Sequence, residues 1–167
     1  LKCRISDDFE RTGAPRWKED HVVHITPGAE FDAAVGRWLP EVERVLAAPN
    51  LPGEERKEVE RYLGVLKERT SDKLYRRLGW MTRAHPYILD GHRIILPLYH
   101  DGFSVSLMAV SDDGGATWRT SEPLLGGGNI QPSLARRKDG TLVAYMRDNG
   151  PPPKRVMASE SRDGGLT

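Results

Sequence analysis

A short polar motif occurs twice in this chain and constrains the fold more than any other feature. Residues 111–118 have the order Ser-x-Asp-x-Gly-x-Thr-Trp, and residues 161–167 repeat it as far as the Thr. Ser and Asp side chains can bond nearby backbone amides, Gly can adopt a positive φ, and Trp can cover the turn with apolar surface. The motif therefore predicts a tight turn between strands, and its return after fifty residues predicts a repeated β unit.

A third, degraded copy of the motif precedes these two. It occupies residues 6–12 and keeps Ser6, Asp8 and Thr12, whereas Glu10 stands where Gly belongs. Glycine suits the tightest part of such a turn because it lacks a Cβ atom. We interpret this segment as a worn version of the same turn.

The recurring residues of the motif are expected to have a structural role. A calcium loop would need more oxygen ligands at alternating positions and a late Glu, so we expect no metal at these turns. The residues assigned to the turns are Ser111, Asp113, Gly115, Thr117 and Trp118 in the first copy and Ser161, Asp163, Gly165 and Thr167 in the second.

The pattern resembles the Asp box, or BNR repeat, of the sialidase-like β-propellers, in which each box closes the hairpin between the two outer strands of a blade. The resemblance covers about half of the chain, from Arg83 to Thr167. It implies a mainly β fold: a sialidase-like β-propeller fragment with a helical hairpin insertion. Blades take ~40–50 residues and a ring needs roughly four to eight of them. The chain therefore corresponds to about two blades plus an extra segment, and we expect it to be part of a longer protein.

The spacing of the motifs divides the chain into four segments. The interval between the first two copies exceeds one blade by about the length of a helical stretch, so we interpret that stretch as an insertion. The predicted segments are residues 1–26 (the end of a preceding blade), 27–79 (the helical insertion), 80–125 (a blade with its Asp box at 111–118) and 126–167 (a second, truncated blade with its Asp box at 161–167).

Apolar spacing predicts two helices in the insertion. Phe31, Val35 and Leu46 belong to one helical stripe, in which Pro40 is expected to start a fresh turn and bend the axis. After a Pro-rich break, Leu63 and its helical neighbours form a second stripe. We expect this hairpin to pack on a larger body, with a partner-binding or lid function as the alternative.

Alternating apolar residues predict the strands, which are separated by Asp-Gly turns and the motifs. In the first unit they cover 86–89, 93–99, 104–110 and 118–123, and in the second 130–136, 141–147 and 155–161. A further β-prone run covers 21–25. Gly126-Gly127-Gly128 is interpreted as a linker, because no Lys-Ser/Thr pair or helix follows it.

Composition excludes several function classes. Lys plus Arg number 25 against 24 acidic residues, without a basic run, so nucleic acid is not an expected partner. No apolar run reaches the ~18 residues of a membrane span. His21 and His24 would point to opposite faces of a strand, so we predict no metal and no cofactor. Cys3 has no second Cys to pair with, and the N-terminus does not reveal the compartment. Secretion or a periplasmic location fits the resemblance, and no feature indicates an oligomeric state.

Polar residues stand at equivalent places in the two units, where the first strands start and the second strands end. The resemblance implies that arginines at such places bind a substrate carboxylate, and Arg83 and Arg147 match them. A guanidinium suits a carboxylate because it can donate two parallel hydrogen bonds. The alternative is that each Arg pairs with a neighbouring Asp. Gln131 and Asp148 are assigned to orienting the sugar.

Three residues are candidates for proton transfer. Sialidases use a Tyr nucleophile supported by Glu, which we expect beyond Thr167, together with an Asp acid/base. Asp101 matches that Asp, although a hairpin role beside Gly102 is equally open. His85 and His100 depart from the sialidase pattern and suit acid–base chemistry near neutral pH. Substrate hydrogen bonding and loop packing are the alternatives for both histidines.

The resemblance therefore implies a carbohydrate-active enzyme of the exo-sialidase type, a glycoside hydrolase acting at the end of an acidic glycan or oligosaccharide. One alternative is a uronate-directed polysaccharide lyase or glycosidase, in which a His or Tyr99 acts as the base. Another is a non-catalytic glycan-binding propeller, because a fold does not fix a function. The fragment by itself is expected to be inactive.

Overall fold

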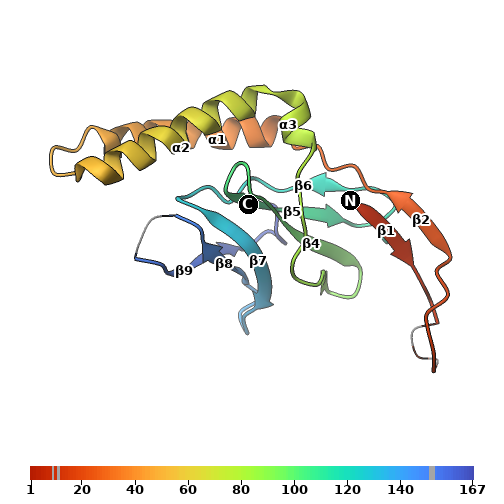
Figure 1. The fold of residues 1–167 in the computed structure, drawn as a ribbon. Helices are drawn as coiled ribbons and strands as arrows, with labels where there is room; N and C mark the ends of the chain where they lie inside the picture. The colour runs from red at the N-terminus through yellow and green to blue at the C-terminus, as the bar shows by residue number, and fades with distance from the viewer. Residues whose placement is uncertain (9, 11, 151–152) are drawn as a thin grey trace.

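The computed structural model describes residues 1–8, 10, 12–150 and 153–167. Its strands form three antiparallel sheets, each made of consecutive strands (Figure 1). Antiparallel neighbours need no crossover connection, so the second and third sheets are simple meanders and the first is a single antiparallel pair. The strands are β1 (Lys2–Ile5) and β2 (Glu19–Val22) in the first sheet, β3 (Tyr87–Leu89), β4 (Arg93–His100), β5 (Val105–Ser111) and β6 (Arg119–Thr120) in the second, and β7 (Asn129–Arg136), β8 (Leu142–Asp148) and β9 (Val156–Ser161) in the third.

A helical hairpin lies between the first and second sheets in the chain. It consists of α1 (Ala29–Leu46) and α2 (Gly53–Ser71), followed by the short α3 (Lys73–Arg77). Figure 1 shows α1 and α2 side by side across the top of the sheets. The two long helices were predicted from their apolar stripes, and the structure confirms them.

The helices bury their apolar stripes on the second sheet. Phe31 and Val35 of α1 and Leu66 of α2 share one core with Leu98 and Phe103. The rings of Phe31 and Phe103 lie 5.8 Å apart between centroids. Removal of these side chains from water is what holds the hairpin on the sheet.

Helix α1 differs from its prediction at Pro40. The sequence predicted a fresh turn there, but one helix runs through this residue. Proline has no N–H, so the carbonyl group of Gly36 loses its helical partner. Both residues are exposed, and water can satisfy that carbonyl group.

Helix α3 was not predicted. The carboxylate of Asp72 accepts hydrogen bonds from the amides of Leu74 (2.8 Å) and Tyr75 (3.2 Å), which are otherwise unpaired in a first turn. The feature of the sequence that could have predicted this helix is an Asp followed by a short polar stretch.

Strand β5 is buried on both faces, which shows how the sheets stack. Val105 and Leu107 belong to the core shared with the helices and with residues that follow β2. Met108 and Val110 point the other way and pack against Leu142 of the third sheet. The second sheet is therefore the middle layer, with β1–β2 on one side and β7–β9 on the other (Figure 1). The fold is mainly β, as predicted.

The strands predicted within 86–161 agree with the structure to within one residue at each end, with one exception. The strand predicted at 118–123 is reduced to Arg119–Thr120, after which pairing continues only as an isolated bridge between Ser106 and Leu124. The run predicted at 21–25 also differs, since β2 covers Glu19–Val22.

Candidate functional site

The first complete motif forms a hydrogen-bonded turn between β5 and β6. The Ser111 hydroxyl donates to Asp113 Oδ1 at 2.8 Å and accepts from the Gly115 amide at 2.8 Å. Asp113 also accepts from the Thr117 amide (2.9 Å) and hydroxyl (2.5 Å). Trp118 Nε1 donates to the Gly115 carbonyl group at 2.9 Å, so the indole folds back over the turn.

The second motif repeats this geometry after β9. Ser161 donates to Asp163 at 2.7 Å and accepts from the Gly165 amide at 2.9 Å. The Thr167 hydroxyl donates to Asp163 at 2.7 Å. Gly115 and Gly165 have φ values of 93° and 87°, which explains the glycines at these positions.

The degraded copy keeps the first contact of the motif. The Ser6 hydroxyl donates to Asp8, whose carboxylate also accepts from the Arg16 amide at 2.9 Å. It lies in the connection between β1 and β2. Phe9 and Arg11 of this copy lie outside the described residues.

The Asp side chains of the two complete motifs are held by hydrogen bonds within their own turns. The hydrogen bonds that Asp113 accepts from Thr117 and Ser111 lower the pKa of its carboxyl group to about 2. Partial burial raises the pKa of Asp163, but hydrogen bonds from Ser161 and Thr167 outweigh this effect and hold it well below its usual range. The described residues include no group of three or more His, Cys, Asp or Glu placed to hold a metal ion.

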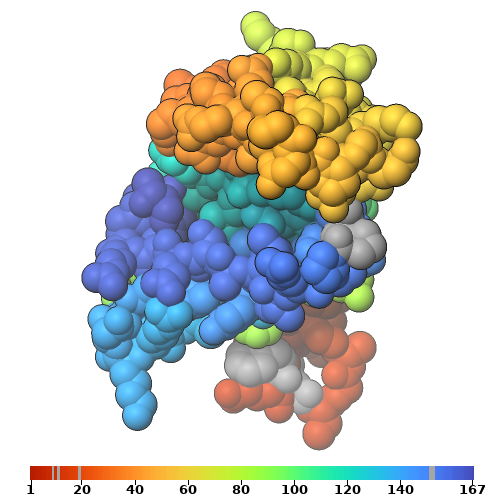
Figure 2. Space-filling model, turned by 90° about the vertical axis from the view of Figure 1, so that its left-hand side faces the viewer, coloured from red at the N-terminus to blue at the C-terminus, as the bar shows by residue number. Residues whose placement is uncertain are grey.

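The motifs lie at one end of the sheets and a cavity lies at the other. β5 and β9 end at the motifs, whereas the loops that follow β4 and β8 lie at the opposite strand ends. These loops and α2 enclose a cavity of about 540 Å³. Figure 2 views this side of the molecule, with the helices above the blue residues of the third sheet. The volume is within the range of small-ligand sites.

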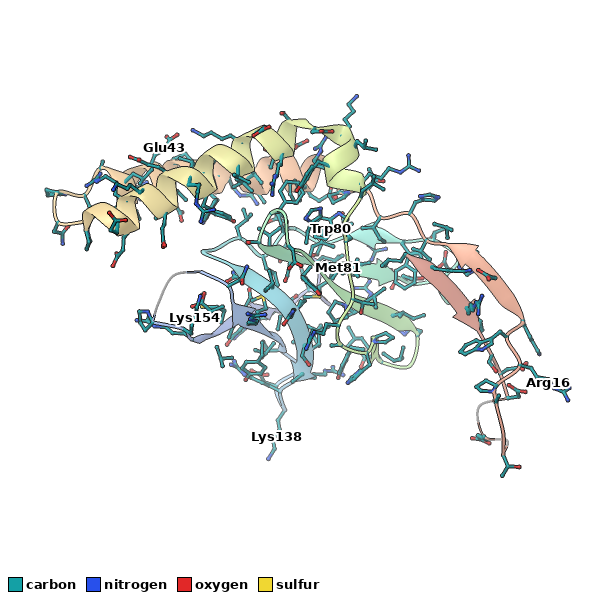
Figure 3. All side chains as sticks on the ribbon, viewed as in Figure 1. Arg16, Glu43, Trp80, Met81, Lys138 and Lys154 are labelled. Carbon is teal, nitrogen blue, oxygen red and sulfur yellow. The ribbon has the colours of Figure 1, made fainter. Side chains whose placement is uncertain are left out.

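Three loops and one helix line the cavity. Asp101 and Ser104 come from the β4–β5 loop, Gly128 from the segment before β7, and Asn149 and Lys154 from the β8–β9 loop. Figure 3 shows Lys154 beneath the helical hairpin. Helix α2 contributes Glu58, Arg61, Tyr62 and Arg69.

Glycine allows two of these loops to pack backbone against backbone. A Cβ atom on Gly128 would lie 2.4 Å from the Gly150 nitrogen, and one on Gly150 would lie 2.0 Å from the Gly127 oxygen. The Asn149 amide donates to the Gly128 carbonyl group at 2.8 Å. The segment interpreted as a linker therefore also forms part of the cavity wall.

Cationic side chains outnumber acidic ones around the cavity. Arg61, Arg69 and Lys154 face Glu58 and Asp101. Arg69 donates to the Gly102 carbonyl group and lies 4.7 Å from the centre of the Tyr75 ring. Neither partner neutralises its charge.

The three candidates for proton transfer lie in different environments. Asp101 lines the cavity and is exposed. His85 is exposed but lies outside the cavity lining, and its Nδ1 contacts the Pro86 carbonyl oxygen at 3.0 Å.

His100 is built into the core. It is 5% exposed, its Nε2 lies 2.6 Å from the Leu78 carbonyl oxygen, and its Nδ1 accepts from the Gly102 amide at 3.0 Å. Burial lowers the pKa of His100, since it disfavours the charged ring. Both ring nitrogens are bonded to the backbone, and this geometry favours the packing alternative for His100 over proton transfer.

Neither of the predicted arginines belongs to the cavity lining. Met81 pairs with Tyr99 near the end of β4, and Arg83 follows two residues later, in the segment that leads to β3. Arg147 is the penultimate residue of β8 and lines a hollow next to Lys154. Within the described part of the chain neither guanidinium has a hydrogen-bond or ion-pair partner, so the alternative of pairing with a neighbouring Asp is not observed.

Gln131 and Asp148 have distinct environments. Gln131 has a φ of 56° and lies within the register shift between β7 and β8. Such backbone strain often occurs where side chains are aimed at a ligand. Asp148 accepts hydrogen bonds from the amides of Gly150 (2.7 Å) and Arg155 (3.3 Å), and so fixes the β8–β9 loop.

Comparison with known families adds to this geometry. Residues 70–167, more than half of the chain, match the family described as BNR repeat-like domain. The chain belongs to the BNR repeat-like family. No curated protein and no solved structure matches it significantly. In this BNR repeat-like chain α1 and nearly all of α2 lie outside the matched residues, so the cavity has one wall from the repeats and one from outside them.

Sequence reasoning missed the residues that α2 brings to the BNR repeat-like cavity. Arg61 and Arg69 looked like the solvated face of an amphipathic helix, because the sequence does not show which sheet end that face overhangs. Tyr62 also lines the cavity, but burial strongly raises the pKa of its hydroxyl group. This change opposes formation of a phenolate, so Tyr62 is not an activated nucleophile. None of the helices in the described part combines the length and apolar character of a membrane span.

Proposed function

We propose that this chain is part of a sialidase-like, carbohydrate-active enzyme of the exo-sialidase type, which acts at the end of an acidic glycan. The proposal depends on one observation: Asp101 lies in the wall of a cavity in which cationic side chains are in excess. The cavity is located at loop ends contributed by two neighbouring sheets, which would be adjacent blades of a propeller. BNR repeats are glycan-related, and this supports a sugar ligand.

The role proposed for each side chain follows from its charge and from whether other groups of the protein already bind it. Arg147 and Arg83 bind the carboxylate of the terminal sugar, since a guanidinium can donate two parallel hydrogen bonds to it. Gln131, aimed by its strained backbone, orients the same sugar. Asp148 acts indirectly by holding the β8–β9 loop.

Asp101 acts on the glycosidic oxygen. As a general acid its carboxyl group donates a proton to that oxygen while a Tyr nucleophile of the sialidase type forms a bond to the anomeric carbon and the glycosidic bond breaks. The leaving glycan departs as a neutral alcohol, and Asp101 is left as a carboxylate. His85 remains a predicted hydrogen-bond donor to substrate.

Hydrolysis of a sialyl oligosaccharide by the enzyme that contains this chain tests this proposal. That enzyme should release the terminal sugar, and Asp101→Asn should lower the rate by about 100-fold or more, because the amide cannot supply the proton that a sugar leaving group needs. Glu41→Gln is the matched control, since Glu41 is an exposed carboxylate on α1.

Three results would contradict the proposal in different ways. If Asp101→Asn is as active as Glu41→Gln, Asp101 takes no part in the reaction. Ultraviolet absorbance of an unsaturated product from uronate glycans, without sialoside hydrolysis, would identify a lyase. Acidic-glycan binding without turnover of either substrate would identify a non-catalytic glycan-binding propeller.

A further inference from the structure

Helix α2 brings to the cavity two guanidinium groups that no carboxylate neutralises. Arg61 is exposed and has no hydrogen-bond or ion-pair partner among residues 1–8, 10, 12–150 and 153–167. Arg69 is held against the Gly102 carbonyl group and the Tyr75 ring. A carbonyl group and a ring position this cation but leave its full charge, which favours an anionic ligand.

Cationic side chains are in excess in the cavity wall. Arg61, Arg69 and Lys154 contribute three positive charges, and Glu58 and Asp101 are the acidic residues in the wall. This excess of positive charge favours an anionic ligand over a neutral sugar.

The cavity adjoins a second hollow. Lys154 lines both, and the second hollow also contains Arg147 and Arg155. Cationic groups therefore line both hollows, from the end of β8, where Asp148 is also in the lining, to α2. A ligand that spans both places would meet a cation at each.

We propose that the site takes a glycan with two anionic sugars, and that Arg61 of α2 binds the anionic oxygens on the second one. This inference rests on the proposed function, in which the terminal sugar is bound by the sheet loops. Arg61 lies outside the family match, which covers residues 70–167. The second subsite is thus contributed by the helical hairpin and determines specificity for the leaving part of the glycan.

Calorimetric titration with three probes tests this subsite. The probes are a disaccharide with a carboxylate on each sugar, a disaccharide with a carboxylate on the terminal sugar only, and the acidic monosaccharide. Wild-type chain should bind the first about tenfold more tightly than the second, as expected for one additional charge-assisted contact. That preference should weaken with added salt, which screens exposed charges.

Variants of Arg61 assign the preference to one side chain. Arg61→Ala should abolish the preference and leave the affinity for the other two probes unchanged, and Arg61→Lys should restore part of it. Arg44→Ala is the matched control, because Arg44 is an exposed guanidinium on α1 outside the cavity lining. Unchanged thermal unfolding would show that the variants fold.

The outcomes separate the two proposals. If wild-type chain binds the acidic monosaccharide but does not distinguish the disaccharides, or if Arg61→Ala behaves like Arg44→Ala, the second subsite is wrong and the proposed function stands. If none of the probes binds to wild-type chain, both proposals are wrong.

Discussion

The guanidinium of Arg93 donates from Nη1 to the carbonyl oxygen of Gly164 at 3.2 Å, which joins the second sheet to the Asp box of the third. Its Nε also donates to Asp112 Oδ1 at 2.6 Å, within the Asp box of its own sheet. Arg93 is 21% exposed, so these charge-assisted bonds are partly protected from water. One side chain therefore ties two neighbouring Asp boxes together at the end opposite the cavity.

Arg93→Ala should lower the free energy of unfolding by about 1–2 kcal/mol, because Asp112 and the Gly164 carbonyl group lose partners. Urea unfolding followed by tryptophan fluorescence measures the change. Lys138→Ala is the control, since Lys138 projects away from the sheet in Figure 3. Equal stability of the two variants would show that Arg93 does not tie the sheets.

Gly150→Ala should both destabilise the fold and damage the cavity. The new Cβ atom would meet the Gly127 oxygen at 2.0 Å, so one loop must shift, at a cost of about 1–3 kcal/mol. Gly127→Ala is a close control, because a Cβ atom there meets nothing within 4 Å. Thermal unfolding should separate the two variants, and similar melting temperatures would refute the close loop packing.

The Asp boxes should make the fold sensitive to acid. The folded-state pKa of Asp113 is lowered from 3.8 to about 2, so its contribution to stability is present above 3.8 and is lost as the pH falls toward 2. Asp113→Asn should be less stable than wild type at neutral pH and should lose less stability in that acidic range. Urea unfolding at several pH values measures this. If the free energy of unfolding changes with pH in the same way in both proteins, the hydrogen bonds assigned to Asp113 are contradicted.

His100 should give a second, milder pH dependence. Its pKa is lowered from 6.5 by burial, so stability is full above 6.5 and decreases as the pH falls below it toward the folded-state pKa. In NMR titrations the His100 ring should protonate at a pH below 6.5, the ordinary pKa of an imidazole. His100→Asn should lower the free energy of unfolding at neutral pH by about 1–2 kcal/mol through lost backbone hydrogen bonds. A His100 ring that titrates at or above pH 6.5 would contradict the effect of its burial.

The local parts of the fold could be predicted from the sequence. An Asp box contains its own hydrogen-bond partners within seven residues, as the contacts from Ser111 to Thr117 show. Alternation of apolar residues likewise predicted the strands that follow Tyr87, except the one expected at 118–123. These features depend on neighbours in the sequence, which the sequence displays directly.

The candidate site depends on long-range packing, and the prediction was weaker there. Asp101 was identified because it ends a strand, and it does line the cavity. His100 was identified for the same reason, but its side chain turns into the core beneath Trp80 and Tyr75. Arg61 was overlooked because only the folded hairpin brings α2 over the β4–β5 loop.

A structure of the chain with a bound oligosaccharide carrying two carboxylates tests the central claim most directly. The account predicts that the ligand lies in the cavity between α2 and the loops of the second and third sheets, with one carboxylate hydrogen-bonded to Arg61 and the linkage beside Asp101. A ligand bound at the Asp-box end, or one that makes no contact with α2 or Asp101, would contradict the account.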